Sequence, residues 1–156
     1  MRQWAALLLG TVTLLTGCSR EDATVNQAGI QPMLGAVMND GPEEVRALAE
    51  KHIGLNERNP ANQSTPMITA ATVDQWPMVE ILIDHGADIW AHNEFGDTAA
   101  SYTLDSRILP GSDEDKARLR VIEKLKARGY PFPPPGRDDV LALDKAGKWP
   151  PQGVSR

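Results

Sequence analysis

The chain has 156 residues, with 16 Lys and Arg against 21 Asp and Glu, and a net charge of −5. This excess of carboxylates disfavours nucleic acid as a partner, and we expect none, because binding to phosphates needs concentrated basic side chains. The length suits one domain, although an aromatic content of 5% limits the core that the chain can build.

Residues 1–17 have the organisation of a secretory signal peptide, with Arg2 near the start, an apolar run over 4–15 and small residues before Cys18. The run is shorter than the roughly 20 residues that span a bilayer. Cys18 is the only cysteine, and the Leu-Thr-Gly-Cys that ends with it resembles the lipobox of bacterial lipoproteins. The resemblance implies cleavage before Cys18 and acyl chains, such as palmitate, on that residue. An ordinary signal peptide with a chance cysteine is the alternative.

Residues 18–26 are expected to be the lipidated N-terminus and a polar linker. Loss of Arg2 leaves 15 basic against 21 acidic residues, so charge does not attract the body to an anionic membrane. Attachment therefore depends on the acyl chains, because two lipid signals are needed for stable anchoring. Ser19 stands where Asp favours inner-membrane retention in Gram-negative lipoproteins. The resemblance thus implies an outer-membrane location that faces the periplasm.

Residues 27–130 contain an internal repeat. At an offset of 34 residues the chain matches itself at several places: Pro32-Met33 with Pro66-Met67, Ala36 with Ala70, Asp40 with Asp74, Val45 with Val79, and Leu48 with Leu82. A fixed period of this size is typical of a solenoid, in which each unit buries its apolar face against its neighbours. The sequence therefore predicts a stack of small helical units.

The second copy shows the pattern most clearly. Thr65 is suited to cap a helix that begins at Pro66, where a missing N–H costs nothing. Asp74 lies at a turn where a short polar side chain tolerates left-handed geometry. Apolar residues recur at helical spacing over 79–83, and Gly86 is placed to end that helix.

This pattern closely resembles an ankyrin repeat, which implies an all-α ankyrin-repeat solenoid of about three repeats. In that family a β-hairpin-like finger follows each pair of helices, here over residues 89–98 with Gly96 in the turn. Trp76 stands at a position where the family has Leu, so the resemblance implies that it lies in or near the core. Pro77 is expected to open the second helix of this repeat.

The other two copies are less regular. In the first, His52 replaces the helix-ending glycine, and one extra residue within 58–64 explains an offset of 34 against the family period of 33. The third begins at Thr98 and carries an insertion of about ten residues before a long helix over 113–128. Its acidic start and basic end suit the helix dipole. An irregular last repeat with a charged outer face is typical of a solenoid cap.

Residues 131–156 form a Pro-rich tail. Its consecutive prolines exclude helix and favour extended backbone. A short helix is predicted over 138–146, and residues 147–156 are predicted to be loose. The tail either packs Phe132 and Leu141 against the repeats or reaches for a partner.

The sequence contains no recognisable catalytic set. It has no phosphate-binding glycine loop and no serine elbow. His52, His85 and His92 have ordinary positions in the repeats, and no acidic or thiol ligand is spaced to complete a zinc site with the last two. We therefore expect no enzyme activity, no metal and no cofactor.

The resemblance implies protein binding, because ankyrin fingers and first helices line a concave face that contacts protein partners. Trp90 stands where the family has Asn, and Phe95 lies near the finger turn. Both are candidate anchors, since large aromatic residues dominate binding hot spots. The predicted polar rim consists of Arg58, Asn59, His92, Glu94 and Asp97. The alternative for Trp90 is packing beneath the insertion of the third repeat.

The sequence thus predicts a membrane-anchored periplasmic ankyrin-repeat protein that binds a protein partner. Small lipoproteins of this kind resemble immunity proteins that neutralise toxic effectors, including phospholipases delivered by type VI secretion. A scaffold or accessory factor for a periplasmic enzyme or envelope complex is the alternative. A binder of a small ligand or metal is a third class.

Overall fold

The computed structural model describes residues 31–152, so the expectations for the signal peptide, for Cys18 and for the linker lie outside it. The described part contains seven α-helices and no strand. The helices are α1 (Pro32–Met38), α2 (Pro42–Glu50), α3 (Pro66–Thr72), α4 (Trp76–Asp84), α5 (Ala99–Asp105), α6 (Asp113–Ala127) and α7 (Arg137–Lys145). The predicted all-α repeat fold is confirmed.

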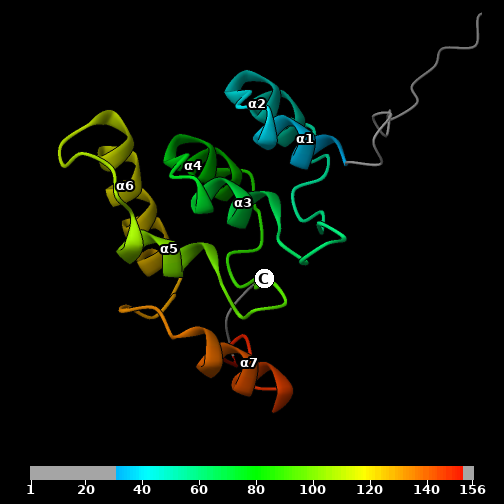
Figure 1. Ribbon diagram of the computed structural model, residues 1–156, viewed down its shortest axis with the longest axis vertical. Coiled ribbons are helices and arrows are strands. Elements are labelled where there is room, and N and C mark those ends of the chain that lie inside the picture. The colour runs from blue at the N-terminus through cyan, green and yellow to red at the C-terminus, as the bar shows by residue number, and fades with distance from the viewer. Residues whose placement is uncertain (1–30, 153–156) are drawn as a thin grey trace, which may run out of the picture.

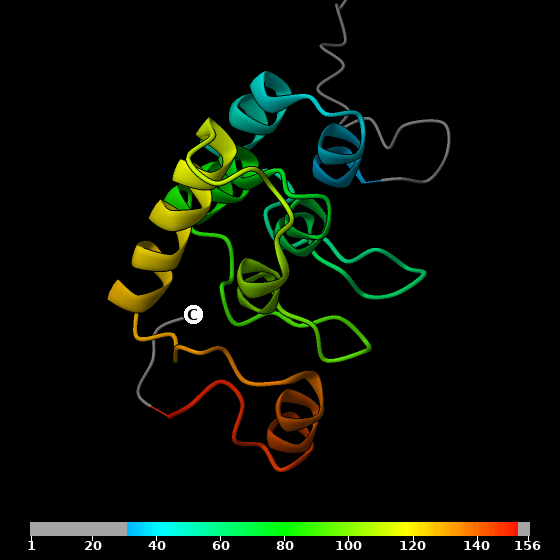
Figure 2. The same ribbon diagram turned by 60° about the vertical axis from the view of Figure 1, so that its left-hand side comes forward.

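The first six helices form two layers. α1 packs on α3 and α3 on α5, while α2 packs on α4 and α4 on α6. The loops that follow α2 and α4 project beyond the layer of α1, α3 and α5, and α7 lies below α5 (Figures 1 and 2). Each pair of helices is therefore one unit of the predicted stack, and the projecting loops are the predicted fingers.

Local sequence explains where these helices begin. Thr65 accepts a hydrogen bond from the Ile68 N–H at 3.3 Å and Pro66 follows it, as predicted. Thr98 and Ser101 form a reciprocal capping box at α5. Ser112 accepts from the Asp115 N–H at 3.1 Å at the start of α6. Each cap satisfies an amide that would otherwise have no partner in its helix.

The turns also follow from the sequence. Asp40 and Asp74 occupy equivalent turns with φ values of 52° and 60°, so the left-handed geometry expected at Asp74 is confirmed. His52 adopts φ 53° where Gly86 adopts 88°. The irregular helix end predicted for the first repeat is therefore a histidine in a conformation that glycine adopts without cost.

The core lies between the two layers. Trp76 and the apolar stripe of α4 (Val79, Leu82 and Ile83) are fully buried, as predicted. Met33 and Met67 fill the first layer, and Val121 and Leu125 of α6 complete the second. Packing between repeats therefore stabilises helices that are too short to be stable alone.

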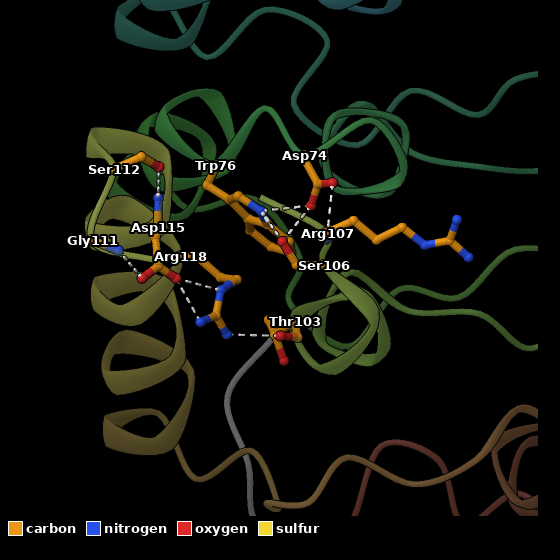
Figure 3. Close-up of polar contacts among 9 residues, drawn as sticks. All are labelled: Asp74, Trp76, Thr103, Ser106, Arg107, Gly111, Ser112, Asp115 and Arg118. Atoms are coloured by element: carbon orange, nitrogen blue, oxygen red, sulfur yellow. Dashed lines mark hydrogen bonds and ion pairs between the residues drawn. The ribbon is translucent and has the colours of Figure 1, made fainter. Parts of the chain in front are cut away.

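The insertion of the third repeat is attached by two carboxylates (Figure 3). Asp74 accepts hydrogen bonds from the Trp76 indole at 3.0 Å and from the Ser106 hydroxyl at 2.6 Å. Asp115 accepts from the Gly111 N–H at 2.8 Å and from Arg118 at 2.6 Å. The hydrogen bond from the Gly111 N–H is the main cause that lowers the pKa of Asp115, and the one from Arg118 adds to it. The insertion is thus fixed at both of its ends.

The tail packs against the last repeat, which settles the two alternatives that the sequence left open. Tyr130, Val140 and Trp149 are buried in the core cluster and Phe132 packs against it, whereas Leu141, which was also predicted to pack there, is 36% exposed and does not belong to that cluster. The Tyr130 hydroxyl donates to Thr98 Oγ1 at 3.0 Å, and burial raises its pKa to about 12. The predicted short helix is present as α7. The expectation of a loose segment from residue 147 is wrong at Trp149, because its indole donates to the Trp90 carbonyl at 2.8 Å.

No helix within residues 31–152 has the length and apolar character needed to cross a bilayer.

Candidate partner-binding surface

Two fingers, residues 55–64 and 89–98, lie side by side and are joined by hydrogen bonds (Figure 2). The Arg58 guanidinium donates to the carbonyls of His92 at 2.6 Å and Gln63 at 2.9 Å. The Glu94 N–H donates to the Asn62 carbonyl at 3.1 Å. The fingers therefore form one surface, in which Arg58 has a positioning role in addition to its exposed place on the rim.

Asn93 shapes the tip of the second finger. Its side-chain oxygen accepts from the N–H groups of Phe95 at 3.0 Å and Asp97 at 2.9 Å. An antiparallel bridge joins His92 to Thr98, so the finger is hairpin-like as predicted. Gly96 closes its turn with φ 84°. The Asn93 side chain thus fixes the backbone at Phe95 and Asp97, and the positive φ of Gly96 allows the turn between them.

Phe95 and Glu94 are the predicted site residues that the tip offers to solvent. The Phe95 side chain is 52% exposed although it is one of the largest apolar side chains of the chain. Glu94 is exposed beside it, and Arg58 is exposed at the neighbouring finger. Asn59 is half-buried and supports its own finger, because its Oδ1 accepts from the Ala61 N–H at 2.9 Å.

The remaining two rim residues face the tail. Asp97 is buried and pairs with Arg137 of α7 at 2.8 Å. His92 is half-buried, with Nε2 3.6 Å from the Asp144 carboxylate and Nδ1 2.8 Å from the Asn93 carbonyl. These two side chains therefore hold α7 against the second finger, and only part of His92 is open to a partner.

Trp90 occupies a different place from the one expected of a binding anchor. It is 2% exposed and stacks on Tyr130, with ring centroids 4.6 Å apart. Trp149 meets its edge at 5.4 Å. Burial beneath a cover was the alternative, but that cover is the tail and not the third-repeat insertion. As placed, Trp90 stabilises the fold and presents no surface to a partner.

Several residues of this region were not predicted. Arg137 and Trp149 attach the tail to the second finger, and Asn93 shapes the tip. Tyr102 of α5 is half-buried, and burial raises the pKa of its hydroxyl while the Thr72 side chain opposes the rise. One signal was available in the sequence, since an aromatic-poor chain has three aromatic residues in its last 27 positions.

Within residues 31–152, no three His, Cys, Asp or Glu side chains gather as metal ligands would. The family model described as ankyrin repeats (3 copies) matches residues 3–93, which is more than half of the chain. The match ends before α5 and α6, which continue the same two-layer stack in the structure. No curated protein matches the chain.

Proposed function

The chain belongs to the ankyrin-repeat family, and we propose that it binds a protein partner through the surface formed by its two fingers. Members of this family typically mediate protein–protein interaction without enzyme activity. The observation that carries the proposal is the exposed Phe95 at the tip of the second finger, beside Glu94 and across from Arg58.

The rigidity of the tip supports this proposal. Hydrogen bonds from Arg58 and Glu94 join the two fingers, and Asn93 and Arg137 fix the second finger from both sides. A surface that is ordered before binding loses less conformational entropy when a partner docks. Phe95 then supplies the apolar contact and the surrounding charged groups supply orientation.

Affinity capture tests the proposal. The full chain is used as bait, with a benzophenone amino acid in place of Phe95 or, as a control, in place of exposed Leu119 on α6. The expected result is one protein cross-linked from position 95 and not from position 119. Equal cross-linking from both positions, or none from 95 at low and moderate salt, would contradict the proposal.

For the location, we propose that Cys18 is lipidated and anchors the protein to the outer membrane on its periplasmic side. The lipobox-like Leu15 to Cys18, the short apolar run before it and Ser19 after it support this proposal. Growth with an alkyne analogue of palmitate should label the chain in the membrane fraction, and Cys18→Ser should lose both the label and the membrane association. Labelling that survives Cys18→Ser would refute lipidation at this residue.

For the partner, we propose a toxic effector, such as a phospholipase, that an immunity protein would neutralise at the membrane. The small size, the ankyrin repeats and the lipobox-like signal support this role. If a toxin gene lies beside the gene for this protein, its expression should kill cells that lack the protein, and the full chain should restore growth while Phe95→Ala should not. If the neighbouring gene encodes an envelope enzyme whose activity depends on this protein, the accessory role replaces immunity.

A further inference from the structure

Three exposed aliphatic side chains lie near the C-terminal ends of the first helices of successive repeats. Met38, Val73 and Leu104 are 58%, 60% and 59% exposed. Each stands at or next to the C-terminal end of the first helix of its repeat, that is α1, α3 or α5. They stand seven, eight and six residues after the N-caps Gln31, Thr65 and Thr98, so they share one end of the layer but point in different directions. Seven-residue helices put this end of the layer roughly 10 Å from the helix N-termini that the fingers precede.

A groove of about 440 Å³ lies at this end of the layer, and Val73 is the one of the three that lines it. Val73, Met78 and Ile108 contribute its apolar walls. The groove is lined by residues of the turn of the second repeat and of the insertion of the third, two segments that a hydrogen bond from Ser106 to Asp74 joins at 2.6 Å. We call this hollow the turn groove, because the turns that join first and second helices line it.

The turn groove is also acidic. Asp40, Asp74 and Glu114 line it, and no Lys or Arg does. Asp74 is engaged with Trp76 and Ser106. Asp40 accepts a hydrogen bond from the Gln75 side chain at 2.9 Å, and both Asp40 and Glu114 are exposed carboxylates at the rim. Figure 3 shows the guanidinium of Arg107 pointing away from Asp74, although its backbone N–H faces that carboxylate at 3.5 Å. No neighbouring cation within the lining therefore neutralises the rim.

We propose that the turn groove binds a segment of a partner protein that carries an aliphatic side chain flanked by Lys or Arg. The aliphatic side chain would displace water from the walls formed by Val73, Met78 and Ile108. The basic flanks would meet Asp40 and Glu114, and complementary charge gives such a contact its specificity. The net charge of −5 also favours the approach of a basic segment.

This site is separate from the finger surface. The fingers precede the N-terminal ends of α3 and α5, whereas the turn groove lies at their C-terminal ends. The two surfaces can therefore be occupied at the same time, by two proteins or by two parts of one protein. The groove proposal does not depend on the role of Phe95.

A displayed library of random 16-residue peptides tests the proposal. The library is selected on the full chain, and the enriched peptides are then measured by fluorescence anisotropy against variants. Val73→Ser and Glu114→Lys together alter one wall and one rim charge at exposed positions, so folding should be retained. Leu119→Ser, on the outer face of α6, is the matched control, and Phe95→Ser reports on the finger surface.

We expect enriched peptides with aliphatic residues next to Lys or Arg, and at least a tenfold loss of affinity for the double variant. Leu119→Ser and Phe95→Ser should bind these peptides as the unmodified chain does. The proposal is overturned if no peptide is enriched, if the peptides are acidic, or if the double variant binds them equally. Peptides that depend on Phe95 alone would support the finger surface and refute the groove. A dimer that Val73→Ser dissociates would assign the groove to a second copy of this chain instead.

Discussion

Replacing Trp149 with alanine should detach the tail from the repeats and lower the free energy of unfolding by about 3 kcal/mol, the lower end of the range for buried Trp. We take the lower end of this range because the tail contacts the repeats from one side only, so fewer neighbours surround Trp149 than surround a residue between the two layers. The indole is buried against Trp90 and Tyr130, with ring centroids at 5.4 and 6.0 Å, and it donates to the Trp90 carbonyl at 2.8 Å. The change would therefore remove a packed ring and leave a carbonyl without its partner.

Thermal and urea denaturation, followed by circular dichroism, would measure this loss. For a domain of this size we expect the midpoint to fall by roughly 12 °C, at about 4 °C per kcal/mol. Hydrogen exchange should speed up in α7 and in the second finger, since Arg137 and Asp144 hold the two together. Leu109→Ala, at an exposed position in the insertion, is the control and should change stability by less than about 0.5 kcal/mol.

The reasoning would be refuted if Trp149→Ala left the midpoint within the range of the Leu109→Ala control. In that case the tail would not cap the solenoid. Trp149→Phe separates the two contributions, because it keeps an aromatic ring and loses the hydrogen bond. We expect it to cost about 1–2 kcal/mol.

Three further changes test other parts of the structure. Gly96→Ala should cost about 2 kcal/mol more than Gly86→Ala by urea denaturation, because a Cβ at Gly96 would lie 2.3 Å from the Arg137 carbonyl while Gly86 has open space, and both have positive φ; equal losses would contradict the tail's close approach. Ser112→Ala should cost about 1 kcal/mol by removing the cap of α6, and an unchanged midpoint would contradict that cap. Glu80→Gln should cost about 0.5–1 kcal/mol at pH 7. The hydrogen bond from Arg120 holds the pKa of Glu80 below its usual value, so its contribution is present above the unfolded pKa and is lost as pH falls through the folded one. A Glu80→Gln difference that persisted in acid would exclude this ion pair as its cause.

The sequence predicts the second repeat almost residue by residue, because its rules are local. Thr65 caps the helix that it precedes, Asp74 takes the left-handed turn, and Gly86 ends α4. Such effects depend on neighbours a few positions away, and so they can be read without the fold. The repeat period of the sequence then indicates that equivalent helices of neighbouring repeats pack against one another, which predicts the two layers.

The attachment of the tail could not be predicted in the same way. Trp149 meets Trp90 across 59 positions and Arg137 meets Asp97 across 40, so neither contact has a local pattern. Trp90 is unusual for its repeat position, but a large aromatic residue there is equally consistent with binding to a partner and with packing against another segment of the chain. Four of the eight aromatic residues gather there: Trp90, Tyr130, Phe132 and Trp149. The available clue was that three of these four residues lie within the last 27 positions of the sequence.

The candidate site was predicted in part for the same reason. Phe95 and Glu94 lie at a finger tip, and the period alone gives that position. His92 and Asp97 belong to the same finger, but their side chains turn toward α7, whose place depends on the tail. The sequence therefore identifies the surface and not the division of its residues between a partner and the tail.

The central claim, that the finger surface binds a protein partner, is tested most directly by the affinity of the captured protein for the full chain and for Phe95→Ala. The affinity is measured by calorimetry with the thermal midpoint recorded alongside. The account predicts saturable binding that weakens at least tenfold in the variant while the midpoint stays within about 2 °C, as for an exposed substitution. Binding of equal strength to both proteins would contradict it, because Phe95 would then take no part in the contact.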